Sequence, residues 1–196
     1  MTATGLHGYY WYYRLMLSLL LLLCLPQTVL AEDGSIRFRE FAIHRSEDAS
    51  VLQASLKLDY QLNQYLRDGL LNGMALENEI RFELEWHNTW WLNSRKQWHT
   101  VKTELKYHPL SKQYQLVNSA SRESWSFPNL AGALLKMGAL ADYPLPALPD
   151  NAVNNDAFIA VTARLTPKTL YLPLKIQSLF SDRYSLESEE MLWSVP

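Results

Sequence analysis

Cysteine is almost missing from the sequence, which has 196 residues and a single cysteine, Cys24. Disulfide frameworks and cysteine-rich metal sites need several cysteines at set spacings, so both are excluded. Cys24 lies in an apolar run, and Leu23 before it is not the small residue that a lipoprotein signal carries there. We interpret Cys24 as an apolar member of that run, without chemistry of its own.

The sequence also lacks an excess of either charge, with 18 Lys and Arg residues against 20 Asp and Glu residues. Domains that bind nucleic acid carry a basic patch, so we expect no nucleic-acid partner. Hydrophobic residues make up 48% of the sequence and charged residues 19%, a composition that excludes an intrinsically disordered chain. The length suits one domain once a targeting segment is removed.

The spacings that mark common catalytic sites are missing as well: H-E-x-x-H, G-x-S-x-G, S-x-x-K and a glycine-rich phosphate loop. Four histidines follow the N-terminal segment, none at a metal-ligand spacing: His44, His87, His99 and His108. We interpret them as solvated or uninformative residues of strands and turns. The carboxylates of 79–85 have the period of an exposed strand face, with Lys102 and Lys106 as ion-pair partners. The sequence therefore gives no catalytic residue, no metal site and no cofactor.

The N-terminal segment has the pattern of a signal peptide. Arg14 is the only charged residue before Glu32, and the run Leu15–Leu25 that follows it has 11 residues. A helix that spans a bilayer needs roughly 20 apolar residues, whereas a signal needs fewer and ends at small residues such as Ala31. We expect residues 1–31 to be a signal peptide and 32–196 to be a single domain in the periplasm. The alternative is an uncleaved anchor in the inner membrane, with the aromatic run 9–13 at the interface and the domain facing the periplasm.

Alternation of apolar and polar residues with period two dominates the rest of the chain and is typical of half-buried antiparallel strands. It marks strands at 52–60, 80–86, 101–107 and 159–165, and more weakly at 36–44, 113–118 and 184–193. Helical spacing marks two segments, about 62–72 and about 128–138. Gly73 closes the first, and in the second Ser126 is the expected N-cap, with Pro128 in the first turn. We expect a mainly β fold, an antiparallel sheet or β-sandwich with these two short inserted helices, and a surface connection at 143–149.

The segments 79–86 and 101–107 are expected to form a hairpin. Their apolar residues occupy even and odd positions respectively, so directly paired residues must have an odd index sum. A sum of 185 places Glu83 opposite Lys102, and every other charged pair along it is also complementary. We expect this register, with a bulge allowed near the tip. The alternative, an index sum of 187, would centre the turn on Asn93-Ser94 but would place like charges opposite each other. The register places His108 opposite Glu77, far from His87.

The tip of that hairpin is rich in tryptophan: Trp90 and Trp91 are consecutive, and Trp98 follows. If the strand continues there, one of the consecutive rings must point away from the core. An exposed tryptophan can stack on a sugar, enter a membrane interface or anchor a protein partner, whereas covered rings would belong to the core. We take Trp90, Trp91 and Trp98 as candidate partner-binding residues and leave the burial of the first two open.

Several stretches together resemble one known family. The stretches are 58–62 and 65–73, then 80–85 with Trp90-Trp91, then 105–114, and finally 161–165 with Leu172-Pro173-Leu174. They are similar to the exported proteobacterial family called domain of unknown function 4390, apart from Tyr171 where the family pattern tends to repeat proline. The resemblance implies an envelope protein of this size and no assigned activity. Members often lie beside a nitrogen-type sensor histidine kinase, which implies an accessory role in signalling.

Two functions are compatible with this sequence. The first is a non-catalytic periplasmic binding or adaptor module that acts through its sheet or its tryptophan-bearing hairpin end on an unidentified envelope protein or polymer, with an inner-membrane sensor kinase among the candidates. The second is an envelope enzyme of the hydrolase class whose site forms only in the fold. A purely structural envelope protein is a third. Contact with the membrane is expected only through an uncleaved N-terminal segment.

Export gives the first testable prediction. Mass spectrometry of the protein isolated from its native cells should find Glu32 at the N-terminus, because signal peptidase cuts after the small residue Ala31. A native chain that begins at Met1 and extracts with the bilayer would show an anchored protein instead.

Overall fold

A computed structural model describes residues 34–46, 51–86, 94–148, 157–168 and 184–194. All of them belong to the second of two units into which the chain divides, Glu32–Pro196. Within these ranges no helix is both long and apolar enough to cross a membrane. Trp90 and Trp91 lie outside the described residues, as does the predicted signal segment.

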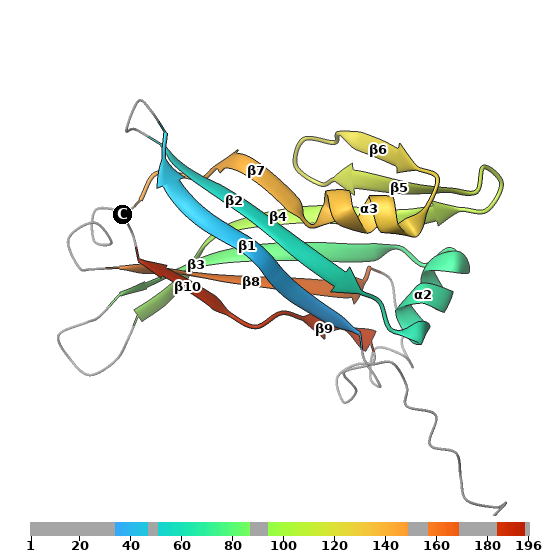
Figure 1. Ribbon diagram of the computed structural model, residues 1–196, viewed down its shortest axis with the longest axis horizontal. Coiled ribbons are helices and arrows are strands. Elements are labelled where there is room, and N and C mark those ends of the chain that lie inside the picture. The colour runs from blue at the N-terminus through green and yellow to red at the C-terminus, as the bar shows by residue number, and fades with distance from the viewer. Residues whose placement is uncertain (1–33, 47–50, 87–93, 149–156, 169–183, 195–196) are drawn as a thin grey trace, which may run out of the picture. The chain divides into compact units, whose positions relative to one another are not determined.

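The described residues form two antiparallel sheets (Figure 1). The three-stranded sheet has the order β1-β2-β7, with bounds β1 Ser35–Arg45, β2 Leu52–Gln61 and β7 Ala139–Pro144. The larger sheet has the order β10-β8-β3-β4-β5-β6, and β9 also pairs with β8. Its strands are β3 Leu76–Trp86, β4 Ser94–His108, β5 Gln113–Asn118, β6 Ser124–Phe127, β8 Phe158–Pro167, β9 Leu186–Glu187 and β10 Met191–Ser194.

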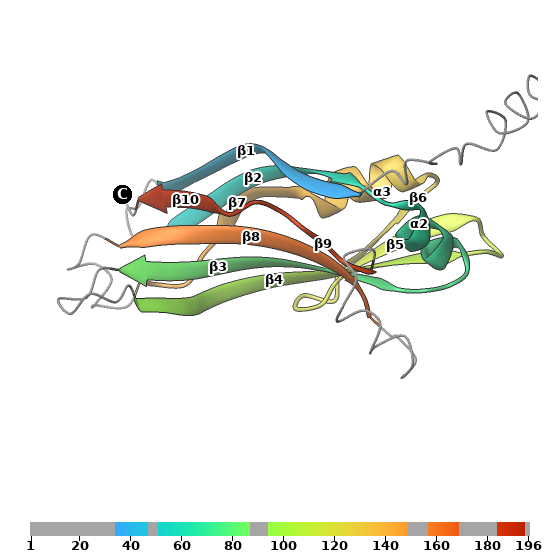
Figure 2. The same cartoon turned by 90° about the horizontal axis from the view of Figure 1, so that it is seen from below.

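The two sheets lie one above the other and share one hydrophobic core (Figure 2). The period-two alternation explains this packing, because it places every second side chain of a strand on the inner face. In β3 the even-numbered residues from Leu76 to Phe82 are buried, while the odd-numbered residues from Glu77 to Glu83 are partly exposed. Leu56 and Leu58 of β2 belong to the same core from the opposite sheet. The expected mainly β, antiparallel fold is confirmed.

The described residues include two short helices, each with an asparagine cap. In α2, Gln64–Leu71, the side chain of Asn63 accepts a hydrogen bond from the Leu66 amide at 2.9 Å. Gly73 follows with a φ of 89°, a left-handed conformation that glycine adopts without strain. Asn129 caps the second helix, α3, Leu130–Met137.

The predicted cap of α3 was therefore wrong. Ser126 lies in β6 and pairs with Gln115 of β5, so it is not available to a helix. Pro128 lies before the cap rather than in the first turn. Both helices are also shorter than expected, because asparagine, which caps as well as serine does, stands inside each predicted segment.

Strand β7 was not predicted, because the proline-rich stretch around it indicated a surface connection. Pro144 closes the strand at a sheet edge, where the missing N–H is tolerated. The pairing of β7 with β2 is irregular, since Ala141 and Asp142 together lie opposite Ser55. Asp142 has a φ of 48°, and its amide donates to the Ser55 hydroxyl at 3.1 Å, which stabilises the bulge. β6 was missed as well because four residues give too little alternation to detect.

The register of the central hairpin differs from the expected one. Glu79 pairs with Lys102 and Phe82 with His99, an index sum of 181, so the parity was correct but the register of 185 was wrong. A bulge does occur near the tip, where Trp98 is the extra residue between His99 and Gln97. His108 pairs with Gln113 of β5, not with Glu77.

The physical reason is the weakness of exposed ion pairs, each of which contributes less than about 1 kcal/mol. Core pairing prevails, with Leu76 opposite Leu105 and Asn78 opposite Thr103 on the inner face. The observed register even sets Glu77 opposite Glu104. Lys102 lies 3.7 Å from Glu77, and Lys106 lies 2.6 Å from Glu104, so both carboxylates have a counter-charge.

A buried polar chain links the two sheets. The Tyr60 hydroxyl of β2 donates to Asn78 Oδ1 of β3 at 2.7 Å, and Asn78 Nδ2 donates to Thr103 Oγ1 of β4 at 3.3 Å. Burial raises the pKa of Tyr60, so its proton stays in place as a donor. The chain fixes how β2 lies over the β3–β4 pair, because any shift would leave buried polar atoms unpaired.

Removing a member of this buried hydrogen-bond chain should destabilise the fold. We expect Tyr60→Phe to lower the free energy of unfolding by about 1–3 kcal/mol, because Asn78 loses its buried donor. Asn78→Leu should cost at least as much, and the double variant less than the sum of the two. Urea unfolding measures all three, with Ser124→Ala on the exposed edge as a control within about 0.5 kcal/mol of the native protein. If the double variant loses as much free energy of unfolding as the two single variants together, the two hydrogen bonds are not coupled and the prediction is wrong.

Candidate functional site

Of the predicted partner-binding tryptophans, the structure describes Trp98. It is partly buried against the core, and its indole N–H donates to the carbonyl of Ala147 at 3.4 Å. As the extra residue of the bulge, it is turned out of the regular alternation of β4. Trp90 and Trp91 lie outside the described residues. The role of all three in binding stays a prediction.

The described histidines lie apart from one another. His99 of β4 contacts the Tyr143 hydroxyl at 3.2 Å, and burial lowers its pKa. His108 lies 2.9 Å from Gln115 Oε1 on the outer face of the larger sheet. His44 lies 3.4 Å from Asp142 on the other sheet, and His87 is outside the described residues. Among the residues placed in the structure, no three His, Cys, Asp or Glu side chains gather at metal-ligand distances.

A serine, an aspartate and a histidine do meet on the three-stranded sheet. The Ser55 hydroxyl donates to Asp142 Oδ1 at 3.1 Å, and His44 Nε2 lies 3.4 Å from the same oxygen. A hydrolytic triad needs the histidine between serine and aspartate, so that it can take the serine proton. Here the aspartate lies in the middle. The group stabilises the Asp142 bulge and does not have the order of a Ser-His-Asp triad.

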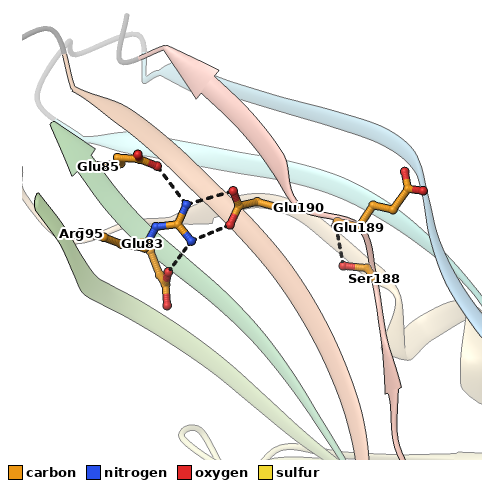
Figure 3. Close-up of polar contacts among 6 residues, drawn as sticks. All are labelled: Glu83, Glu85, Arg95, Ser188, Glu189 and Glu190. Atoms are coloured by element: carbon orange, nitrogen blue, oxygen red, sulfur yellow. Dashed lines mark hydrogen bonds and ion pairs between the residues drawn. The ribbon is translucent and has the colours of Figure 1, made fainter. Parts of the chain in front are cut away.

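An arginine surrounded by three carboxylates lies on the outer face of the larger sheet (Figure 3). Arg95 of β4 forms a two-pronged pair with Glu190, with Nη1 at 2.8 Å and Nη2 at 2.9 Å from its oxygens. Arg95 Nη2 also donates to Glu85 of β3 at 2.9 Å, and Nη1 lies 3.6 Å from Glu83. Hydrogen bonds to Glu190 and Glu85 raise the pKa of Arg95, so it is charged throughout the working range.

We call Arg95, Glu83, Glu85 and Glu190 the arginine clamp. It joins β4 and β3 to the residue before β10, although β8 lies between β3 and β10 in the sheet. Ala160 of β8 pairs with Glu83 and is buried, and its small side chain leaves room for the clamp above it. Next to the clamp, the Ser188 hydroxyl accepts a hydrogen bond from the Ala163 amide of β8 at 2.9 Å. Two side chains therefore fix the segment that leads into β10.

Strand β10 itself is almost entirely apolar. Phe158 of β8 and Met191 and Leu192 of β10 belong to the large hydrophobic residues that the described part of the chain leaves exposed. On the inner side, Trp193 packs edge-on against Phe41 of β1, with ring centroids 5.5 Å apart. Exposed apolar residues at the edge of a sheet mark an interaction surface more often than isolated ones do. This β8–β10 edge is the candidate functional site.

No pattern in the sequence singles out this site. Alternation predicts a weak strand within 184–193, but 95 residues separate Arg95 from Glu190, and nothing in either segment shows that they meet. The signal that was available is the contrast between the acidic Glu187–Glu190 segment and the uncharged residues 191–194 that follow it.

The family called Domain of unknown function (DUF4390) matches residues 33–194, nearly the whole described unit. The chain belongs to the DUF4390 family. No curated protein and no solved structure matches it. The family has no assigned activity, so the function of this DUF4390 domain has to be argued from its own residues.

The clamp predicts how β10 responds to a mutation. In Arg95→Gln, three carboxylates lose their counter-charge, so we expect faster amide hydrogen exchange at Met191–Ser194. The free energy of unfolding should fall by no more than about 1 kcal/mol, because exposed charges are screened by solvent. Arg39→Gln is the matched control, since Arg39 forms a simple exposed pair with Asp59 at 2.6 Å. Faster exchange spread evenly over the domain, or none at β10, would contradict the role of the clamp.

Proposed function

We propose that this DUF4390 domain is exported and works in the periplasm as a non-catalytic binding or adaptor module of the cell envelope. The observation that carries the proposal is the group of exposed apolar residues on the β8–β10 edge, Phe158, Met191 and Leu192. Leu192 and Phe158 lie diagonally on the same face of the β8–β10 pair, and clustered exposed apolar residues often mark an interaction site. The signal-like pattern of residues 14–31 supports export.

The tryptophan-bearing connection starts beside this edge. Glu85 of β3 pairs with Phe158 of β8, and β3 ends one residue later at Trp86. Figures 1 and 2 show the ends of β3 and β10 together with the start of β8 at one end of the sheet. The segment 87–93, which contains Trp90 and Trp91, continues from that end. Loops at one end of a β-sandwich are common binding sites, because the sheets hold them in place.

An envelope hydrolase has less support. The described residues that most resemble a hydrolytic site are Ser55, Asp142 and His44, and they lack the triad order in which the histidine contacts the serine. A binding role needs no such geometry. The partner we expect is an envelope protein or polymer, with an inner-membrane sensor histidine kinase as one candidate, and membrane contact would come only from a retained N-terminal segment.

The test is an affinity capture from envelope extracts with the full chain. We expect the native protein to retain a specific protein or polymer and the Trp90→Ala/Trp91→Ala variant to lose it, with little change in melting temperature. Leu135→Ala is the control, because Leu135 is exposed on α3, away from this end. A kilocalorie of stability corresponds to roughly 2–4 °C in a domain of this size. A double variant that unfolds would show core tryptophans, and a native chain found in the cytoplasm would refute the proposal.

A further inference from the structure

The four sheet edges of the described fold differ in how they are protected against another strand. Natural proteins protect an edge with charges, proline, bulges or a covering element. β1 has a bulge at Arg39 and several charged side chains, and β7 has the Asp142 bulge and Pro144. β6 lies against α3. β10, with the sequence Met-Leu-Trp-Ser, has none of these features.

The edge of β10 that faces away from β8 has no partner strand within the described residues. β10 forms backbone pairs with β8 over four residues and with no other described strand. β1 approaches at Ile36, which forms a single bridge with Ser188, but farther along no backbone pairing joins β1 to β10. Phe41 and Trp193 contact each other there through their rings. An added strand would find unpaired backbone groups on β10 and apolar side chains beside them.

The start of β10 is negatively charged. Glu189 and Glu190 directly precede the strand, and the one positive charge of the arginine clamp is already shared by three carboxylates. Glu187 lies opposite Arg164 of β8 and does not add to this charge. Figure 3 shows the Glu189 side chain pointing away from Arg95. This end of the edge therefore suits a basic residue.

We propose that β10 binds an extended segment of another envelope protein by strand addition, with apolar residues along the strand and a Lys or Arg beside Glu189. The inference rests on the proposed binding function and names the surface and the kind of partner. A second copy of the chain fits less well. In a centred antiparallel pairing of two β10 strands, Glu189 and Glu190 would lie opposite Pro196 and Val195, so no positive charge meets them.

The probe is a fluorescent octapeptide of alternating Val and Thr with two Lys residues at one end, titrated into the purified full chain. We expect saturable binding and slower amide exchange confined to β10 and its neighbours. A peptide N-methylated at every residue should not bind, because neither of its edges can then donate backbone hydrogen bonds to β10. Replacement of the two Lys residues by Glu should weaken binding at least fivefold at low salt.

Three variants locate the binding edge. Leu192→Lys should weaken binding of the Lys-tailed peptide at least tenfold, because a charge on an edge strand opposes pairing. Leu135→Lys is the matched control and should bind as the native protein does, since Leu135 is 73% exposed on α3 and Leu192 is 56% exposed on β10. Glu189→Lys should reverse the preference toward the Glu-tailed peptide. This charge swap remains informative if Leu192→Lys does not fold.

Three results would overturn the inference. They are unchanged binding to both Leu192→Lys and Glu189→Lys, protection away from β10, and a dimer in sedimentation whose β10 amides are already protected without peptide. The last would assign the edge to a second copy. None of these results touches the capture experiment with Trp90→Ala/Trp91→Ala, so a failed strand addition with a successful capture leaves the binding function standing and moves the site to the hairpin end.

Discussion

The burial of the inner face of β3 constrains the rest of this structure. β3 pairs with β4 on one side and β8 on the other over nearly its whole length, and its even-numbered side chains from Leu76 to Leu84 face the core that it shares with the three-stranded sheet. Each such side chain contributes roughly 1.5–3 kcal/mol on burial. Asn78 adds a buried polar contact with Tyr60 that helps to fix the alignment of the two sheets. The charges on the outer face then have to adapt to a register that the core has selected.

Because core burial selects the register and exposed charges adapt to it, some features of the fold could be predicted from the sequence and others could not. Alternation in 52–60 and 80–86 gave the correct faces, because each apolar residue adds independently to the burial of its strand. The register of the hairpin was wrong, because it was chosen from exposed charge pairs that are weak in water. The inner-face pair of Asn78 and Thr103 has more influence on the register than the exposed charges do. Its contribution to stability depends on the hydrogen bond from Tyr60, which belongs to the other sheet.

The candidate site was hidden for a related reason. The clamp joins residues of β3 and β4 to the segment before β10, which is distant from both along the chain. The segments meet because β8 pairs with β3 on one side and with β10 on the other. Local patterns report periodicity and caps, not which strands become neighbours. Trp98 shows the same limit. It is the extra residue of a β-bulge, and its indole donates to Ala147. No sequence pattern predicts at which residue such a bulge falls.

The way in which β10 is attached supports its use as a binding edge. Four residues paired with a single strand would fray in isolation, so β10 depends on anchors at both of its ends. The clamp and Ser188 hold its start to the sheet, and Trp193 holds its later part to Phe41 of β1. The clamp and Trp193 act through side chains, whereas Ser188 is also held through its backbone, by the hydrogen bond from its amide to the Ala163 carbonyl at 2.9 Å and by its bridge to Ile36. Among the described residues, none of these anchors uses the outer backbone groups of Met191–Ser194. A strand held in this way is already extended before a partner arrives, which lowers the entropy lost on binding. The same contacts that complete the fold therefore keep the edge open and ordered.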